Sequence, residues 1–135
     1  RLAAERRTDE QIERLRESVS KCELVGHDHQ RFVVQSSEFH TLLVQTAGNR
    51  TMMLLHSVIS AIIDMAKFRR FADIEESNAR NKAVTYGASA HSRVVDLIEA
   101  GDGDAAETLW SKHLAASNRL LLELPGSSEP LDLFD

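Results

Sequence analysis

The sequence predicts an all-α fold, an antiparallel bundle of about six helices. Apolar residues recur at helical spacing along most of the chain, and no stretch alternates apolar and polar side chains as a half-buried strand does. The turn Gly101-Asp102-Gly103 separates two long helical patterns, and glycine tolerates the positive φ that ends a helix. These two helices are therefore expected to fold back on each other. The 135 residues suffice for one domain with a sizeable core.

Composition and charge narrow the class of protein. The chain is 42% hydrophobic with two prolines and six glycines, which is typical of a globular domain. Its net charge of −5 argues against binding of nucleic acid by these residues alone. The single cysteine, Cys22, cannot form an internal disulfide and fits the reducing cytoplasm. No apolar run approaches the ~18 residues of a membrane span.

The first two helices follow from a capping signal. Residues 1–7 resemble the end of a helix that begins upstream. Thr8 then takes the N-cap of a second helix, with Gln11 at the third position of a capping box. The apolar positions of that helix are Ile12, Leu15, Val19 and Cys22. Their helical spacing predicts one face that packs into the bundle.

A third helix is expected from about Asp28 to Ala47. Its inner stripe is mainly apolar but includes two polar residues one turn apart, Ser36 and His40. Gly48 ends this helix, and Asn49 caps the next one. The stripe therefore carries polar candidates for a site toward the core.

The fourth helix, to about Arg70, is apolar on most of its sides. Because a helix that is apolar all round is normally buried, we expect residues 52–65 to be the most buried segment. His56 lies eight residues after Gly48 and His40 lies eight before it. Antiparallel packing about Gly48 would place these two histidines level.

The helices on either side of Asp102 each carry a histidine. His91 lies eleven residues before Asp102 and His113 eleven after it, so both sit about 16 Å from the turn at ~1.5 Å per residue. Both lie on apolar stripes, and antiparallel packing brings them to one level. Two level imidazoles that face one core predict a binding site.

The segments that flank this hairpin are less regular. Residues 73–82 are polar and compatible with a helix, which Gly87 is expected to interrupt. The last helix runs to about Glu123, where Pro125-Gly126 breaks the pattern. We expect the tail, residues 125–135, to lie on the surface.

The order of these residues resembles the ligand-binding C-terminal (FCD) domain of FadR-type transcription regulators in the GntR family. The family pattern is roughly a Phe, an Asp four residues later, Phe-His, a small-Gly-Asn turn, then His-x2-[IV]-x3-Ile-x2-Gly-Asp, an Ala and a final His. The matching residues here are Phe32, Ser36, Phe39-His40, Ala47-Gly48-Asn49, His91, Val94, Ile98, Gly101-Asp102, Ala105 and His113. The opening LAAERRTDEQIERL also resembles the family's first helix and its junction to the second. The resemblance covers nearly the whole chain.

This resemblance implies an effector-binding domain that controls an N-terminal winged helix-turn-helix domain, which is absent from these residues. Many such domains hold a divalent metal by one Asp and three His, and the metal receives a small carboxylate. The matching histidines are His40, His91 and His113, and we expect zinc or nickel. Ser36 stands where the metal-binding members carry Asp, and a neutral hydroxyl is a poorer ligand than a carboxylate. Three imidazoles alone can hold zinc with water in the remaining position.

Three further residues are candidates for effector binding. Ser36 is either a weak or water-mediated ligand or a neutral pocket wall. Arg69 is either an anchor for an effector carboxylate or a charge at a helix end. His56 is either an effector contact or a core residue. Trp110 is expected to be a core side chain.

The sequence therefore favours an effector-binding domain over residues 1–124, with residues 125–135 as a tail. The expected partners are a small organic acid, a second copy of the chain in a homodimer, and DNA only through the missing domain; no membrane is expected. One alternative is a metal-free ligand-binding domain, and another is a small helical metalloenzyme. A di-iron bundle requires Glu-x-x-His pairs, and the chain contains none. A hydrolytic zinc site requires a nearby carboxylate as general base, and the inner stripes offer no obvious one.

Overall fold

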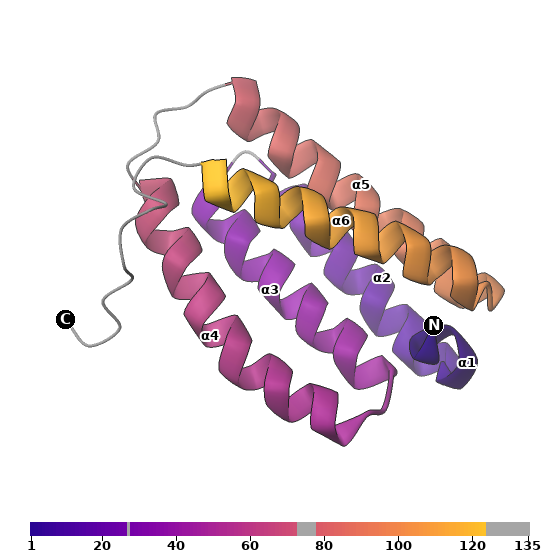
Figure 1. Cartoon of the computed structure of the whole chain (residues 1–135). Coiled ribbons are helices and arrows are strands. Elements are labelled where there is room, and N and C mark those ends of the chain that lie inside the picture. Colours follow the sequence, from indigo (N-terminus) through magenta and orange to yellow (C-terminus); the bar gives the residue numbers. More distant parts are fainter. Residues whose placement is uncertain (27, 73–77, 124–135) are drawn as a thin grey trace.

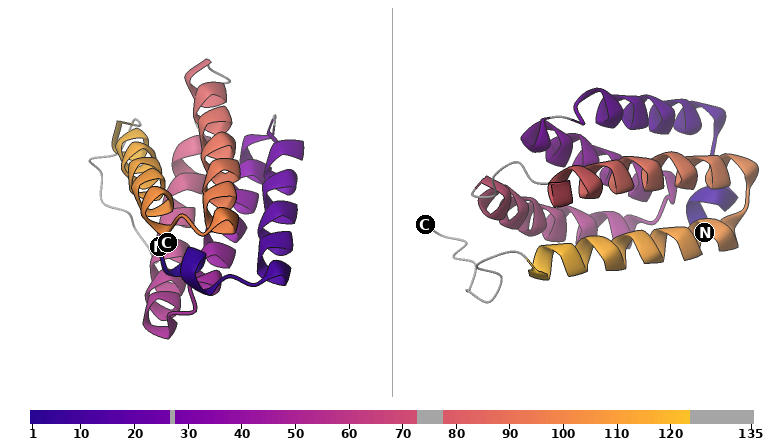
Figure 2. Two further views of the ribbon diagram at one scale, coloured as in Figure 1. Left: turned by 90° about the vertical axis from the view of Figure 1, so that its right-hand side faces the viewer. Right: turned by 90° about the horizontal axis from the view of Figure 1, so that it is seen from above.

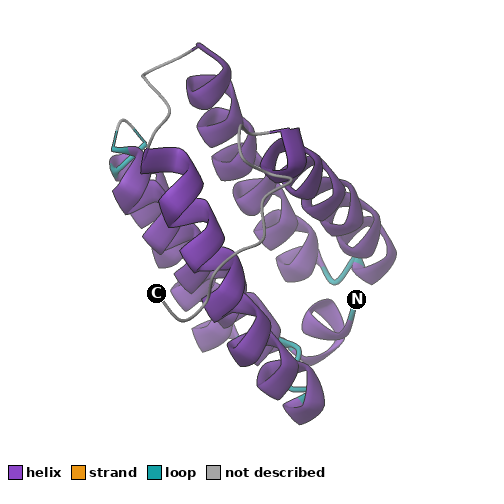
Figure 3. Ribbon diagram, turned by 60° about the vertical axis from the view of Figure 1, so that its left-hand side comes forward, coloured by secondary structure: helices purple, strands orange, loops and turns teal. Residues whose placement is uncertain are grey.

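The computed structural model describes residues 1–26, 28–72 and 78–123, without the side chains of residues 29, 65–72, 78–81, 83 and 120–123. These residues form helices and no strand (Figure 3). The helices are α1 (Leu2–Arg6), α2 (Asp9–Leu24), α3 (His29–Thr46), α4 (Arg50–Ala72), α5 (Asn78–Ala100) and α6 (Gly103–Glu123). The all-α prediction is confirmed, and the predicted tail lies outside the described residues.

The helix ends use the residues that the sequence indicates. Thr8 and Gln11 form the capping box of α2, with the Thr8 N–H donating to Gln11 Oε1 at 3.0 Å. Asp102 accepts from the Ala105 N–H at 3.0 Å and so caps α6. Gly48 and Gly101 have φ of 62° and 77°, which explains why glycine follows α3 and α5.

The long helices α2 to α6 run antiparallel to their neighbours in the chain (Figure 1). Seen from above, α5 lies between α2 and α6 (Figure 2). It packs against α1, α2, α3 and α6, and α3 likewise packs against α1, α2, α4 and α5. The core that these helices enclose includes Leu15, Val19, Cys22, Phe32, Phe39, Leu43, Val94, Val95 and Ile98. No helix of the described parts combines the length and hydropathy needed to cross a bilayer.

Helix α1 is short, but two consecutive arginines fasten it to the bundle. Arg6 donates to the carbonyl oxygens of Ala47 and Gly48, at 3.0 and 3.3 Å, at the end of α3. Arg7 donates to the carbonyl oxygen of Glu99, at 3.1 Å, at the end of α5. Both helix ends expose carbonyls that lack helical partners, and cations stabilise them.

The expected interruption at Gly87 is wrong, because α5 continues through it without a break. A Cβ at Gly87 would lie 3.2 Å from Cζ of Phe32, closer than side chains normally approach. Gly87 therefore permits α5 to approach the buried Phe32 ring on α3. The cost of glycine within a helix, about 1 kcal/mol, is offset by this packing.

The prediction that residues 52–65 are the most buried segment is also wrong for every side chain of that range that the structure describes. The exposed fractions of Leu54, Val58 and Leu55 are 67, 58 and 51%. The stripe that α4 turns toward α3 is instead polar, with half-buried His56, Ser60 and Asp64 at successive i, i+4 positions. Thr41 Oγ1 lies 3.1 Å from His56 Nε2, and Ser37 donates to Asp64. Helix α4 is thus amphipathic with its polar side inward.

Candidate metal centre

Three histidines from three helices meet in the bundle. His40 comes from α3, His91 from α5 and His113 from α6, and their nearest nitrogens all lie within 4.8 Å of one another. His40 Nε2 is 3.2 Å from His91 Nε2, and the ring centroids of His91 and His113 are 5.1 Å apart. The predicted equal height of His91 and His113 is therefore confirmed. His91 is fully buried and His113 nearly so.

This geometry and chemistry fit a divalent metal. Nitrogens on a tetrahedral zinc lie about 3.3 Å apart for Zn–N bonds of ~2.05 Å, so the 3.2 Å separation of His40 and His91 matches, and a His113 nitrogen lies within 4.8 Å of both. Imidazole nitrogen suits zinc and nickel alike. Among the described Asp and Glu side chains none belongs to the cluster. Three neutral ligands would leave the ion's full charge to be balanced by an incoming anion.

Aromatic rings surround the imidazoles and hold their orientation. Phe39 stacks on His91 with ring centroids 4.2 Å apart and an interplanar angle of 16°. Trp110 lies 4.8 Å from His40 and 4.9 Å from His113, measured between ring centroids. These rings exclude water from one side of the cluster, and a dry surround strengthens electrostatic attraction between an ion and its ligands.

Of the other sequence candidates, His56 lies outside the cluster. Ser36 is half-buried on α3, one turn before His40, and its hydroxyl offers no charge. His56 lies against Thr41 rather than among the three histidines. The side chain of Arg69 lies outside the described residues.

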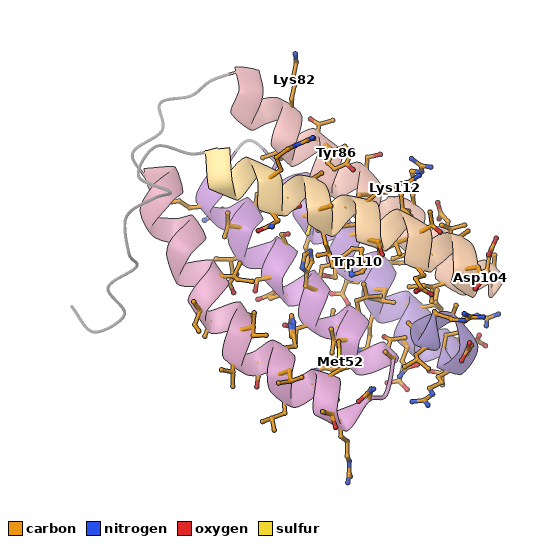
Figure 4. The ribbon with its side chains drawn as sticks, viewed as in Figure 1. Met52, Lys82, Tyr86, Asp104, Trp110 and Lys112 are labelled. Carbon is orange, nitrogen blue, oxygen red and sulfur yellow. The ribbon has the colours of Figure 1, made fainter. Side chains whose placement is uncertain are left out.

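Sequence reasoning missed the contacts of two aromatic residues. Trp110 packs against the core as expected, and its ring also contacts His40, His91 and His113. Tyr86 of α5 stacks over His113 of α6, with centroids 6.2 Å apart, where these helices run side by side (Figure 4). Local spacing gives no signal for Tyr86, because its contact depends on the register of two helices. The position of Trp110, three residues before His113, could have indicated its role.

This protein is an all-α bundle in which polar groups converge among aromatic side chains. That arrangement is typical of helical binding domains. The family model of the FCD domain matches residues 1–116, and the chain belongs to this family. The chain is 31% identical over 114 residues to the HTH-type transcriptional repressor NanR of Cronobacter sakazakii. This alignment covers 84% of the chain and 42% of that protein. The repressor of the same name from Escherichia coli K12 is 28% identical over 114 residues, 84% of this chain and 41% of that protein. No solved structure matches the chain.

These matches confirm the resemblance to regulators of the GntR/FadR type. They place the chain with domains of transcriptional regulators rather than with enzymes. The chain spans about two fifths of the length of the curated relatives it matches.

Proposed function

We propose that this chain is the effector-sensing domain of a bacterial GntR/FadR-type transcription regulator. It binds a small carboxylate at a divalent metal, zinc or nickel, held by His40, His91 and His113. The observation that carries the proposal is the convergence of three imidazoles from three helices. The bound metal would supply a positive charge to which a carboxylate binds, and effector contacts from Ser36, His56 and Arg69 belong to the same hypothesis.

The whole regulator then has a winged-helix domain upstream of residues 1–124 and works in the cytoplasm. Its relatives carry the name HTH-type transcriptional repressor, and they are about twice as long as this chain. DNA binding belongs to the upstream domain, because the chain has a net charge of −5.

The regulator is further proposed to be a homodimer through α4. Residues 51–63 contain no Asp, Glu, Lys or Arg, so two copies can approach without charge repulsion. The large apolar side chains of this segment that are at least one third exposed are Met52, Met53, Leu54, Leu55, Val58, Ile59, Ile62 and Ile63. A continuous apolar patch of this kind is uncommon on a monomer. When two copies are related by a two-fold axis, the same patch on each copy can pack against its counterpart on the other.

The metal is tested by elemental analysis of protein without a His-tag after reconstitution with zinc. One ion per chain is expected for the native sequence and for His56→Ala, the matched control outside the cluster. His91→Ala and His113→Gln should lose it. Because His91→Ala also removes a packed ring, the quantity to compare is the rise in unfolding midpoint on adding zinc, which subtracts the packing loss. Retention of stoichiometric zinc by both variants would refute the site.

Ser36→Asp sharpens the test. A carboxylate one turn from His40 adds a charged ligand, so zinc should bind roughly tenfold tighter, or about 1.4 kcal/mol. Mono-, di- and tricarboxylates should then stabilise the zinc-loaded protein, by about 2.7 kcal/mol at ~100 times Kd. Stabilisation by carboxylates that survives complete chelation would favour the metal-free binding domain instead.

A further inference from the structure

A second pocket lies one to two helical turns from the histidines, toward α1. It has a volume of about 440 Å³, within the range of small-molecule sites. The same three helices form it, with Leu43 and Val44 following His40 on α3, and Val94 and Ile98 following His91 on α5. Its lining is mainly apolar, and none of the three histidines belongs to it.

Trp110 separates this pocket from the histidine cluster. Its ring contacts the three imidazoles and also lines the pocket. Across the pocket lie Leu2 and Ala3 of α1 and Met52 at the start of α4. Figure 4 labels Trp110 on α6 and Met52 near the start of α4, and both line the pocket. An indole and a thioether in the lining suit an aromatic or aliphatic body.

The charges at the pocket rim disfavour an anion. Arg1 reaches Asp104 at 3.2 Å and Glu5 at 3.5 Å, so its charge is already balanced by two carboxylates. Glu107 supplies a carboxylate to the lining itself. The uncharged hydrogen-bonding groups of the lining are Asn49 and Ser111. This combination accepts a hydroxyl or amide head group and repels a carboxylate.

We infer that this pocket binds a neutral amphiphile, with an aromatic or aliphatic body against Trp110 and a hydroxyl or amide near Asn49 and Ser111. Its ligand class is therefore different from the carboxylate proposed for the histidines. The two sites are independent in chemistry, but they share the Trp110 side chain. The inference does not rest on a metal at the histidines.

The test uses two probes of one shape, 4-phenyl-1-butanol and 4-phenylbutyrate. Trp110 is the single tryptophan of the chain, so its fluorescence reports on binding at this pocket and at the histidines beside it, and chelation separates the two. The alcohol should change the emission saturably and bind at least fivefold more tightly than the acid, with the same affinity after complete chelation. Preference for the acid, or binding of the alcohol only with zinc present, would overturn the inference.

Two further measurements locate the probe. Val44→Phe fills the pocket from α3 and should weaken binding of the alcohol at least tenfold, while Val34→Phe, on the exposed face of the same helix, should not. Nuclear Overhauser contacts should join the phenyl ring to methyl groups of Val94 and Ile98 in the native protein. Unchanged binding in Val44→Phe, or contacts elsewhere on the bundle, would place the alcohol outside this pocket and refute the assignment.

Discussion

Helices α4 and α5 have the same length, 23 residues, yet they occupy opposite environments. Helix α5 packs against α1, α2, α3 and α6, and its Val94, Val95 and Ile98 are at most 1% exposed. Helix α4 packs chiefly against α3 and leaves Leu54 and Val58 more than half exposed. The difference shows that the apolar content of a helix indicates how much of its surface is favourably removed from water. It does not indicate whether the partner surface comes from the same chain.

The largest test of this comparison places one charge on each helix. Val95→Asp buries a carboxylate in the core and should cost about 4 kcal/mol or more, enough to unfold most of the protein. Leu54→Asp should change the unfolding free energy of the monomer by less than about 0.5 kcal/mol. Urea unfolding of dilute protein measures both.

The same pair of variants separates packing from assembly. In sedimentation velocity at high protein concentration, Leu54→Asp should convert the proposed dimer to monomer. A dimer that tolerates Asp at position 54 would show that α4 is not the interface. Equal destabilisation by Val95→Asp and Leu54→Asp in dilute solution would contradict the difference in burial between α5 and α4.

A smaller effect is expected at the polar side of α4. Asp64→Ala leaves the half-buried Ser37 hydroxyl without its acceptor and should cost about 1–2 kcal/mol. Ser37→Ala combined with Asp64→Leu should cost less than the sum of the single changes, because both partners are then apolar. A double-mutant cycle gives the coupling energy. Strict additivity would mean that this contact does not hold α4 against α3.

A further contrast between α4 and the core concerns the reactivity of cysteine thiols. Burial raises the pKa of the Cys22 thiol to about 11, while an exposed cysteine at position 54 should titrate near its usual ~8.5. At neutral pH the Leu54→Cys thiol should therefore react with a disulfide reagent roughly 300-fold faster than Cys22, from the thiolate fractions alone. Stopped-flow labelling of dilute protein gives both rates. Comparable rates would mean that Cys22 is accessible.

The raised pKa of Cys22 also predicts a pH dependence of stability. The folded pKa exceeds the unfolded one, so the unfolded chain loses its thiol proton first as pH rises. The contribution to stability is complete below about pH 8.5 and declines between there and pH 11. Cys22→Ala should show a flatter stability curve in this window.

Much of the fold and part of the site could be predicted from local spacing. Helix ends at Thr8, Gly48 and Gly101 follow from capping chemistry, and the meeting of His91 with His113 follows from their equal distance to Asp102. Helical spacing placed His40 on an inner stripe, but only the resemblance to a family joined it to His91 and His113. Local patterns gave no reason to expect the contact of Tyr86 or the polar inner stripe of α4, because each depends on which neighbour a helix meets.

The two arginines of α1 give the first residues of the chain a mechanical role. Arg6 and Arg7 are consecutive, yet they bind the ends of α3 and α5, the helices that carry His40 and His91. Any displacement of α1 would therefore change contacts with both helices at once. Through Arg6 and Arg7, α1 is a structural connection between the two helices that carry His40 and His91.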